Sequence, residues 1–180
     1  MAPQGSWARA AAIIAFVALT PCLAAHAADT PQPLNVDAYL HRPNLLVTDL
    51  DRALTLYRDV LGFTAHAIID SPPGSYSYAI YDLPPEAKLR FMFLSTASQQ
   101  RVLALTEVKG VSLPPTRRPY EGATIIEVKG DLAPILVKVK MLGLAVDAPV
   151  ALTAPSGQTR TDVAVTDFDG HRLVLFKIDQ

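Results

Sequence analysis

Along the chain, a run of hydrophobic residues typical of a β-strand is followed by hydrophobic residues at the spacing of an α-helix. This order occurs twice. Short β-branched runs predict strands at 39–47 and 123–128. Each run leads through an Asp-Leu pair into apolar residues at three- and four-residue spacing, which predicts helices at about 50–61 and 132–142. Both helices close on Leu-Gly, a common helix stop. The repeated unit predicts two similar modules that pack against each other, with a ligand site between them.

Further strand-like runs follow each helix, separated by Pro-, Gly- and Ser-rich turns. These runs predict strands at 63–69, 75–81, 89–94 and 102–108, and then at 145–152, 158–165 and 172–178. Tyr76 and Tyr78 would share one face of their strand, since alternate residues point the same way. Thr48 is the predicted N-cap of the first helix, with Asp51 completing an acidic capping box, and Asp131 is the predicted N-cap of the second helix. One helix with several strands in each module predicts an α+β fold.

The N-terminal segment has the features of an export signal rather than of the fold. Arg9 precedes an apolar run, and Ala25-His26-Ala27 has the small-x-small form of a signal-peptidase site. We therefore expect a periplasmic or secreted protein. The predicted organisation is a signal peptide (1–27), a disordered leader (28–36), a first module (37–110), a Pro-rich linker (111–120) and a second module (121–180).

The net charge and the cysteine content limit the classes of partner and of chemistry that are expected. A formal net charge of −1 gives no basic footprint for nucleic acid or anionic lipid, so no nucleic acid is expected, and no membrane after signal cleavage. Cys22 is the only cysteine, and cleavage after Ala27 would remove it together with any disulfide or thiolate chemistry. Lipidation of Cys22 stays open. The expected partner is a small organic ligand, anionic or aromatic.

Three stretches carry a family resemblance. The run at 46–53 (LVTDLDRA), the run at 56–63 (LYRDVLGF) and the closing run at 166–176 (TDFDGHRLVLF) are similar to motifs of the vicinal oxygen chelate superfamily, which includes glyoxalases, bleomycin resistance proteins and extradiol dioxygenases. The resemblance covers about 40–178. It implies paired βαβββ modules that form a curled, mostly antiparallel sheet around a cavity.

The resemblance also implies four strand positions for the ligands of a divalent metal. In this chain those positions are Arg42, Ala104, Ala123 and Val174. Alanine and valine have no donor atom, and arginine is a permanent cation. A one-residue shift would bring in His41, but alternation turns it to the other face of the strand. We therefore expect no metal site and no cofactor.

The side chains expected to line the cavity follow from alternation along the first and last strands of each module. The ligand-binding candidates are Arg42, Asn44, Thr106, Glu127, Val174 and Phe176. Arg42 could hold an anionic or carbonyl ligand as a fixed cation, and a salt bridge to an acid such as Glu127 is the alternative. His41 is expected at an exposed strand edge. His171 follows a tight turn, where we expect it to face water.

Three classes of function remain open from the sequence. The first is an exported, metal-independent binding protein, comparable with the antibiotic-sequestering members of the family. The second is a lyase, isomerase or dioxygenase-type enzyme, with displaced metal ligands or with acid–base catalysis by Arg42, His41 or Glu127. The third is a protein-interaction module. Catalytic residues are unassigned, and a homodimer with modules paired within or between chains also stays open.

Overall fold

The computed structural model describes residues 40–114, 119–153 and 157–178. The expected signal peptide and leader lie outside these residues, as do the start of the first module before Leu40, part of the linker (115–118) and the segments 154–156 and 179–180. The two modules belong to one compact unit, residues 39–180. Within the described part of the chain, no helix is both long and apolar enough to cross a membrane.

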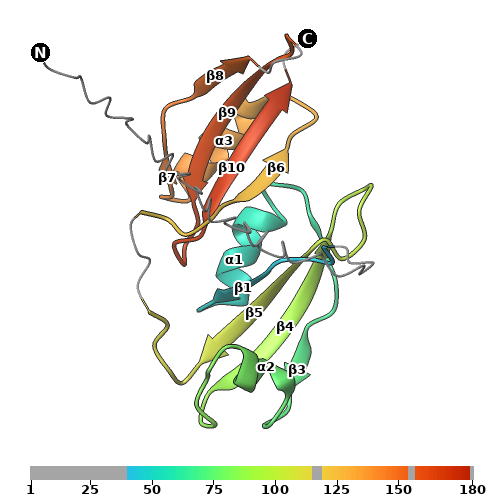
Figure 1. Cartoon of the computed structure of the whole chain (residues 1–180), viewed down its shortest axis with the longest axis vertical. Helices are drawn as coiled ribbons and strands as arrows, with labels where there is room; N and C mark the ends of the chain where they lie inside the picture. Colours follow the sequence, from blue (N-terminus) through green and yellow to red (C-terminus); the bar gives the residue numbers. More distant parts are fainter. Residues whose placement is uncertain (1–39, 115–118, 154–156, 179–180) are drawn as a thin grey trace, which may run out of the picture. The chain divides into compact units, whose positions relative to one another are not determined.

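The first module runs from β1 to β5 and contains two helices (Figure 1). Its elements are β1 (Asn44–Val47), α1 (Leu50–Tyr57), β2 (Thr64–Ala65), β3 (Ile69–Ser71), α2 (Tyr76–Ile80), β4 (Lys88–Ser95) and β5 (Leu103–Lys109). The short strands β2 and β3 both pair with β4, so together they act as one interrupted strand. The module therefore has βαβββ order with α2 inserted before β4.

The second module repeats this order without a counterpart of α2 among the described residues. Its elements are β6 (Thr124–Glu127), α3 (Leu132–Met141), β7 (Ala145–Val146), β8 (Val150–Thr153), β9 (Thr159–Thr166) and β10 (Arg172–Ile178). Again two short strands, β7 and β8, pair with one long neighbour, β9. The expected N-cap is confirmed, since the Asp131 side chain accepts a hydrogen bond from Ala133 N.

Each module forms a five-stranded sheet with the same strand order. β1 pairs in parallel with β5, and β6 pairs in parallel with β10, while the other pairings are antiparallel. The registers also correspond, because Asn44 lies opposite Ala104 and Ile125 lies opposite Val174. The predicted α+β fold of paired βαβββ modules is confirmed.

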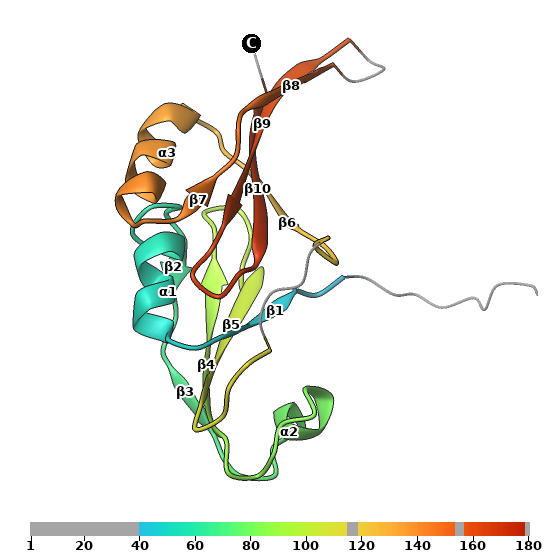
Figure 2. The same ribbon diagram turned by 90° about the vertical axis from the view of Figure 1, so that its left-hand side faces the viewer.

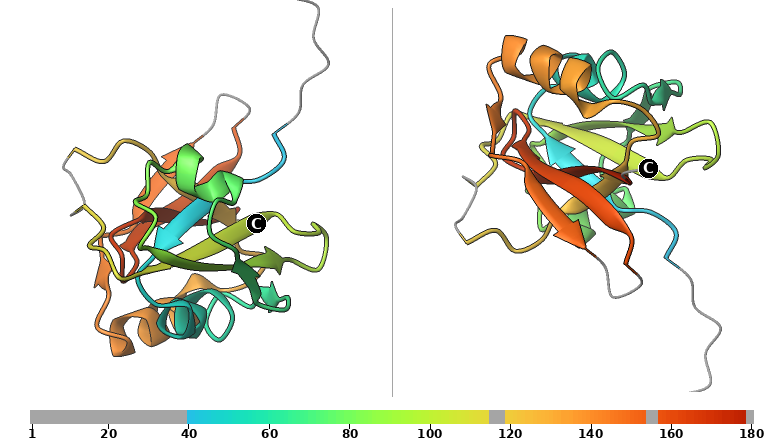
Figure 3. Two further views of the ribbon diagram at one scale, coloured as in Figure 1. Left: turned by 90° about the horizontal axis from the view of Figure 1, so that it is seen from below. Right: turned by 90° about the horizontal axis from the view of Figure 1, so that it is seen from above.

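The helices α1 and α3 pack side by side on one face of the strands (Figures 2 and 3). The main core draws on both modules and includes Leu54 and Tyr57 of α1, Val139 of α3, and Leu173 and Leu175 of β10. In contrast, α2 lies on the other side of the first sheet (Figure 2). There it contributes Tyr78 to a second cluster of buried side chains.

The start of the first module differs from the sequence prediction. β1 begins only at Asn44, directly after Pro43, which cannot donate a ladder hydrogen bond. The N-cap of α1 is Asp49, whose side chain accepts from Arg52 N, so the prediction of Thr48 was wrong. Thr48 instead donates its backbone N–H and its hydroxyl to Asp169 of the second module.

The predicted strand at 75–81 was also wrong, because this segment forms the helix α2. Tyr76 is 73% exposed whereas Tyr78 is buried, so the two rings do not lie on one common face as predicted. The Tyr78 hydroxyl donates to the carbonyl of Ala87 at 2.8 Å, which joins the helix to the chain just before β4. Alternating tyrosines favour a strand locally, but the tertiary anchor of Tyr78 overrides this propensity.

Candidate functional site

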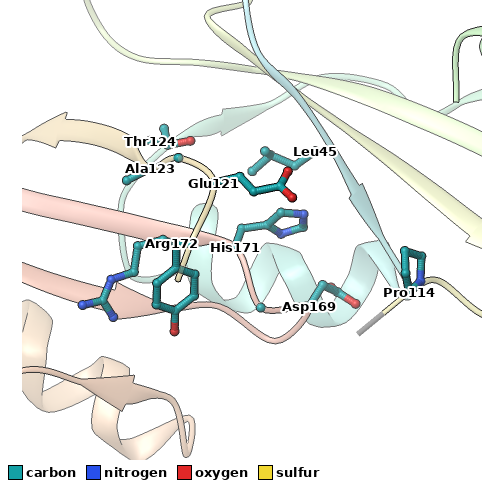
Figure 4. Close-up of a pocket in the computed structure, with 11 residues that line it drawn as sticks. Leu45, Pro114, Glu121, Ala123, Thr124, Asp169, His171 and Arg172 are labelled. Atoms are coloured by element: carbon teal, nitrogen blue, oxygen red, sulfur yellow. The ribbon is translucent and has the colours of Figure 1, made fainter. Parts of the chain in front are cut away.

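A pocket of about 550 Å³ lies where the start of β6 and the turn before β10 approach β1. Its lining comprises Leu45, Pro114, the segment 120–124 and the segment 169–172. In Figure 4 the imidazole of His171 points into this space, with Glu121 and Leu45 nearby, while the guanidinium of Arg172 points away. This volume falls in the range of small-molecule sites.

His171 is held in place by a buried carboxylate four residues earlier. Its Nδ1 lies 2.9 Å from Asp167 Oδ2, and its backbone N–H donates to Asp167 Oδ1 at 2.8 Å. The turn between them contains Gly170 at φ +90°, a conformation that glycine adopts without strain. The Asp167 side chain is 2% exposed and the His171 side chain 25% exposed. The expectation that His171 faces water is therefore met only in part, because Asp167 engages one edge of the ring while the side chain stays partly exposed in the pocket.

Tyr57 of α1 connects the same carboxylate to the first module. Its hydroxyl donates to Asp167 Oδ2 at 2.8 Å, and the Asp169 backbone N–H donates to Oδ1 at 3.0 Å. Burial would raise the pKa of Asp167, but hydrogen bonds from His171 and Tyr57 lower it overall. Asp167 is therefore a carboxylate at neutral pH.

The same environment alters the titration of the two partners of Asp167. Burial would lower the pKa of His171, but the hydrogen bond and the negative charge of Asp167 raise it above its ordinary value. Burial and the nearby Asp167 charge raise the pKa of Tyr57 well above its ordinary value. Tyr57 thus stays a neutral donor, while His171 keeps its proton to a higher pH than an ordinary histidine.

Besides His171, three charged side chains line the pocket: Glu121, Asp169 and Arg172. The contacts of the last two hold them in place. Asp169 Oδ1 accepts from Thr48 N at 2.9 Å and lies 3.3 Å from the guanidinium of Arg52. Arg172 donates to Thr166 and pairs with Asp147, and its guanidinium stacks 4.9 Å from the ring centre of Tyr120. These contacts fix the pocket wall on both sides of His171.

Three of the six predicted ligand-binding residues lie together in the first module. The Thr106 hydroxyl donates to Asn44 Oδ1 at 3.0 Å across the parallel strand pair β1 and β5. Arg42 donates to the carbonyl of Arg101 at 3.1 Å, and its guanidinium lies 4.4 Å from the ring centre of Phe93. Arg42 is thus anchored on the sheet.

The other three candidates lie together in the second module. Phe176 of β10 is directly opposite Glu127 of β6, and Val174 is two residues earlier on β10. Glu127 pairs with Lys129. None of the six candidates lines the pocket described above. As a ligand site they remain a prediction.

Sequence reasoning missed the Asp167, His171 and Tyr57 group. The spacing Asp-x-x-Gly-His in the closing run was a usable signal, because a turn through glycine brings an aspartate and a histidine four residues apart into contact. Nothing local identified Tyr57, which reaches Asp167 from a helix 110 residues away in sequence.

The four positions at which the resemblance implies metal ligands do not fit a metal. The registers place these positions at equivalent points of the two modules, since Arg42 and Ala123 each lie two residues before the partner of Ala104 or Val174. Three of these side chains have no donor atom, and the fourth is a cation. Among the described residues, no three His, Cys, Asp or Glu side chains are grouped as a metal site would require.

Comparisons with known proteins agree on the fold. A glyoxalase family protein from Bacillus cereus superposes with a TM-score of 0.65 at 11% identity, covering 83% of this chain and 100% of that one. A glyoxylase/bleomycin resistance protein/dioxygenase domain from Frankia gives 0.55 at 16% identity, covering 80% and 100%. The trypanothione-dependent glyoxalase I of Leishmania major gives 0.52 at 22% identity, covering 78% and 87%.

At such identities these likenesses show the fold alone. No curated protein matches the sequence. The family model of the Glyoxalase/Bleomycin resistance protein/Dioxygenase superfamily matches residues 39–175, which is most of the chain and includes both modules. The chain therefore belongs to the Glyoxalase/Bleomycin resistance protein/Dioxygenase superfamily.

Proposed function

We infer that this protein is an exported member of the superfamily that binds a small organic ligand between its modules without the usual metal. The observation that carries this proposal is the pocket of about 550 Å³. It has apolar walls at Leu45 and Pro114 and a few fixed polar groups around His171. Ligand sites commonly combine apolar walls with a few placed polar groups.

Metal independence rests on the donor chemistry of the four family positions. Arg42, Ala104, Ala123 and Val174 offer no oxygen or neutral nitrogen ligand to a divalent ion. Export rests on the N-terminal pattern that ends at Ala27. Protein recovered from the periplasm is expected to begin at Ala28 and to contain far less than stoichiometric Mn, Fe, Ni or Zn. A full-length cytoplasmic protein, or one equivalent of metal, would contradict these two points.

Binding can be tested by thermal shift with phenols, small carboxylates and antibiotics in the presence of a chelator. A ligand at a hundred times its Kd should stabilise the fold by about 2.7 kcal/mol. Gly122→Trp is expected to abolish this stabilisation. Gly122 lines the pocket, and a Cβ added there meets no atom within 4 Å, so the larger side chain adds bulk without a backbone clash.

Gly130→Trp is the matched control, because Gly130 is equally open and lies outside the pocket lining. Arg42→Ala tests the alternative location on the sheet face. If Arg42→Ala removes the thermal shift and Gly122→Trp preserves it, the ligand binds on the sheet face and the pocket assignment is wrong. If no compound in the panel stabilises the wild type with chelator present, metal-independent binding is contradicted.

A further inference from the structure

The hydrogen bonds around Asp167 determine which nitrogen of His171 carries the proton. Asp167 accepts from three certain donors: the backbone N–H groups of Asp169 and His171 and the hydroxyl of Tyr57. An ionised carboxylate only accepts hydrogen bonds, so the Nδ1 atom 2.9 Å away must carry a proton. In the neutral ring, Nε2 therefore holds the free lone pair.

This arrangement orients His171 so that its Nε2 atom can accept a proton from a ligand in the pocket. The edge of the ring with Nδ1 is engaged by Asp167, and the ring itself lines the pocket beside Glu121 (Figure 4). A buried carboxylate that holds the Nδ1–H fixes the tautomer and stabilises the imidazolium once Nε2 gains a proton. The carboxylate of Asp167 thus favours proton uptake at the opposite nitrogen.

Charged and titratable groups surround His171 and its partner Asp167, and they come from the turn, α1, the segment before β6 and β10. They are Asp167 and Asp169 in the turn, Tyr57 and Arg52 on α1, Glu121 before β6 and Arg172 on β10. Arg52 lies against Asp169, and Arg172 lies against Asp147. Asp167 and Asp169 both raise the pKa of His171. The imidazolium is therefore the favoured charge state when an anion forms beside it.

The pocket walls restrict the size and shape of what His171 can meet. Leu45 and Pro114 give apolar surface, and Tyr120 adds an aromatic ring that is fixed by the Arg172 guanidinium above it. A volume of about 550 Å³ accommodates a small ring compound. A flat ligand with one acidic hydroxyl could pack on these walls and direct its oxygen to Nε2.

We propose that the pocket binds a weak acid of the phenol or enol type by moving its proton to Nε2 of His171. The ligand O–H bond breaks, an Nε2–H bond forms, and the ligand oxyanion remains hydrogen-bonded to the imidazolium. Asp167 acts as the positioning residue that balances the new positive charge. The proposal rests on the proposed function, since it names the chemical class of that ligand and the group that recognises it.

The test uses 4-nitrophenol as the probe, because its phenolate absorbs at longer wavelength than the neutral phenol. At a pH below the pKa of the free phenol, adding wild-type mature protein is expected to produce the phenolate band. Affinity should peak between the pKa values of His171 and the phenol. Below both values binding must release a proton, and above both it must take one up, so affinity falls on each side.

His171→Gln is expected to abolish the phenolate band and to weaken binding by about tenfold or more, through loss of a charge-assisted hydrogen bond. Asp167→Asn should also lose the band, since an amide can donate to Nδ1 and move the ring proton to Nε2. His66→Gln is the matched control, because His66 contacts Ser95 and does not line the pocket. Thermal unfolding of each variant shows whether it is folded.

The outcomes separate this proposal from the binding function. Bound 4-nitrophenol that keeps the spectrum of the neutral phenol overturns the proton transfer but leaves ligand binding supported. A phenolate band that survives in folded His171→Gln shows that another group takes the proton, which overturns the role of His171. If 4-nitrophenol does not bind while other ligands still stabilise the wild type, the proposed ligand class is wrong and the binding function stands.

Discussion

The two modules share a strand order and a register but differ in what covers the sheet face opposite α1 and α3. In the first module Leu89 and Val108 on this face are buried in the cluster formed with Tyr78 of α2. In the second module Ile125 and Leu152 on the corresponding face are 64% and 41% exposed. Among the described residues, part of this face is therefore covered in the first sheet, whereas the equivalent face of the second sheet is exposed at Ile125 and Leu152.

The difference arises from the connection that leads into the long antiparallel strand of each module. Sixteen residues, 72–87, join β3 to β4 and include α2, whereas five residues, 154–158, join β8 to β9. The cluster around α2 buries Val108 of β5, and β5 is buried without a break from Leu103 to Val108. In β10 buried and partly buried residues alternate from Arg172 to Phe176. A single inserted helix thus changes the burial pattern of a strand whose pairing is unchanged.

Replacing one leucine by alanine on the face opposite α1 and α3, in each sheet in turn, should give the largest difference in stability. Leu89→Ala is expected to lower the free energy of unfolding by about 2–4 kcal/mol, because it leaves a cavity under α2. Leu152→Ala should cost less than about 1 kcal/mol, because its side chain is already 41% exposed. Urea denaturation of both variants measures the difference. Equal losses would mean that the second face is covered in solution and would remove the contrast.

The helix N-termini provide the next test, because α1 is the only helix within the described ranges whose N-terminus donates to a buried carboxylate from a strand. Glu107 Oε1 accepts from Leu50 N at 2.9 Å, and Arg90 Nε lies 2.5 Å from Oε2. Burial would raise the pKa of Glu107, but hydrogen bonds from Arg90 and Leu50 lower it overall. This stabilisation is present above the pKa of the unfolded chain and is lost as the pH falls through the folded pKa.

Glu107→Gln should therefore cost about 2 kcal/mol at neutral pH and flatten the loss of stability below about pH 4.3. Asp131→Ala, which removes the exposed cap of α3, should cost about 1 kcal/mol. Chemical denaturation at several pH values checks both expectations. An unchanged acid dependence in Glu107→Gln would show that the Arg90 contact does not hold the carboxylate ionised.

The turns before the last strands offer a third and smaller contrast. Ser95 Oγ accepts the backbone N–H of Arg101, and Asp167 Oδ1 accepts that of His171 at the corresponding place. Only the second turn carries a titrating pair. The raised pKa of His171 adds stability below about pH 6.5 that is lost as the pH rises through the folded pKa. The lowered pKa of Asp167 adds stability that is lost only in acid.

His171→Gln should accordingly cost about 1 kcal/mol between about pH 4 and 6.5 and clearly less at alkaline pH. Denaturation at about pH 5.5 and in alkaline buffer measures this change, with His66→Gln as the control of matched type. A cost that is the same at both pH values would mean that His171 contributes by packing rather than by its charge.

Much of the fold could be predicted from local pattern. The strand at 172–178 has the predicted bounds, and the helix from Leu132 to Met141 has the predicted cap. Both succeed because the stabilising features, alternation and a capping side chain, lie within a few residues. The helix at Leu50–Tyr57 ends four residues earlier than predicted, before the turn that reaches Gly62. Element ends depend on competing local hydrogen bonds, so they are predicted less well.

The candidate site could be predicted only in part. Alternation correctly brings Asn44 near Thr106 and Phe176 opposite Glu127, because strand pairing preserves faces. The pocket around His171 was missed, since its walls come from a linker, a turn and the other face of β1, marked by Leu45. Loop and turn side chains follow no period that a sequence reveals.

The sequence by itself determined the repeated strand-helix order, the family and the absence of metal-donor side chains at the four family positions, because all of these are properties of residue type and spacing. Tertiary structure alone decided that 76–80 is a helix, that Thr48 bonds Asp169 and that Tyr57 and His171 meet at Asp167. Those contacts join residues distant in sequence. Their energies depend on burial and on partners that no local pattern contains.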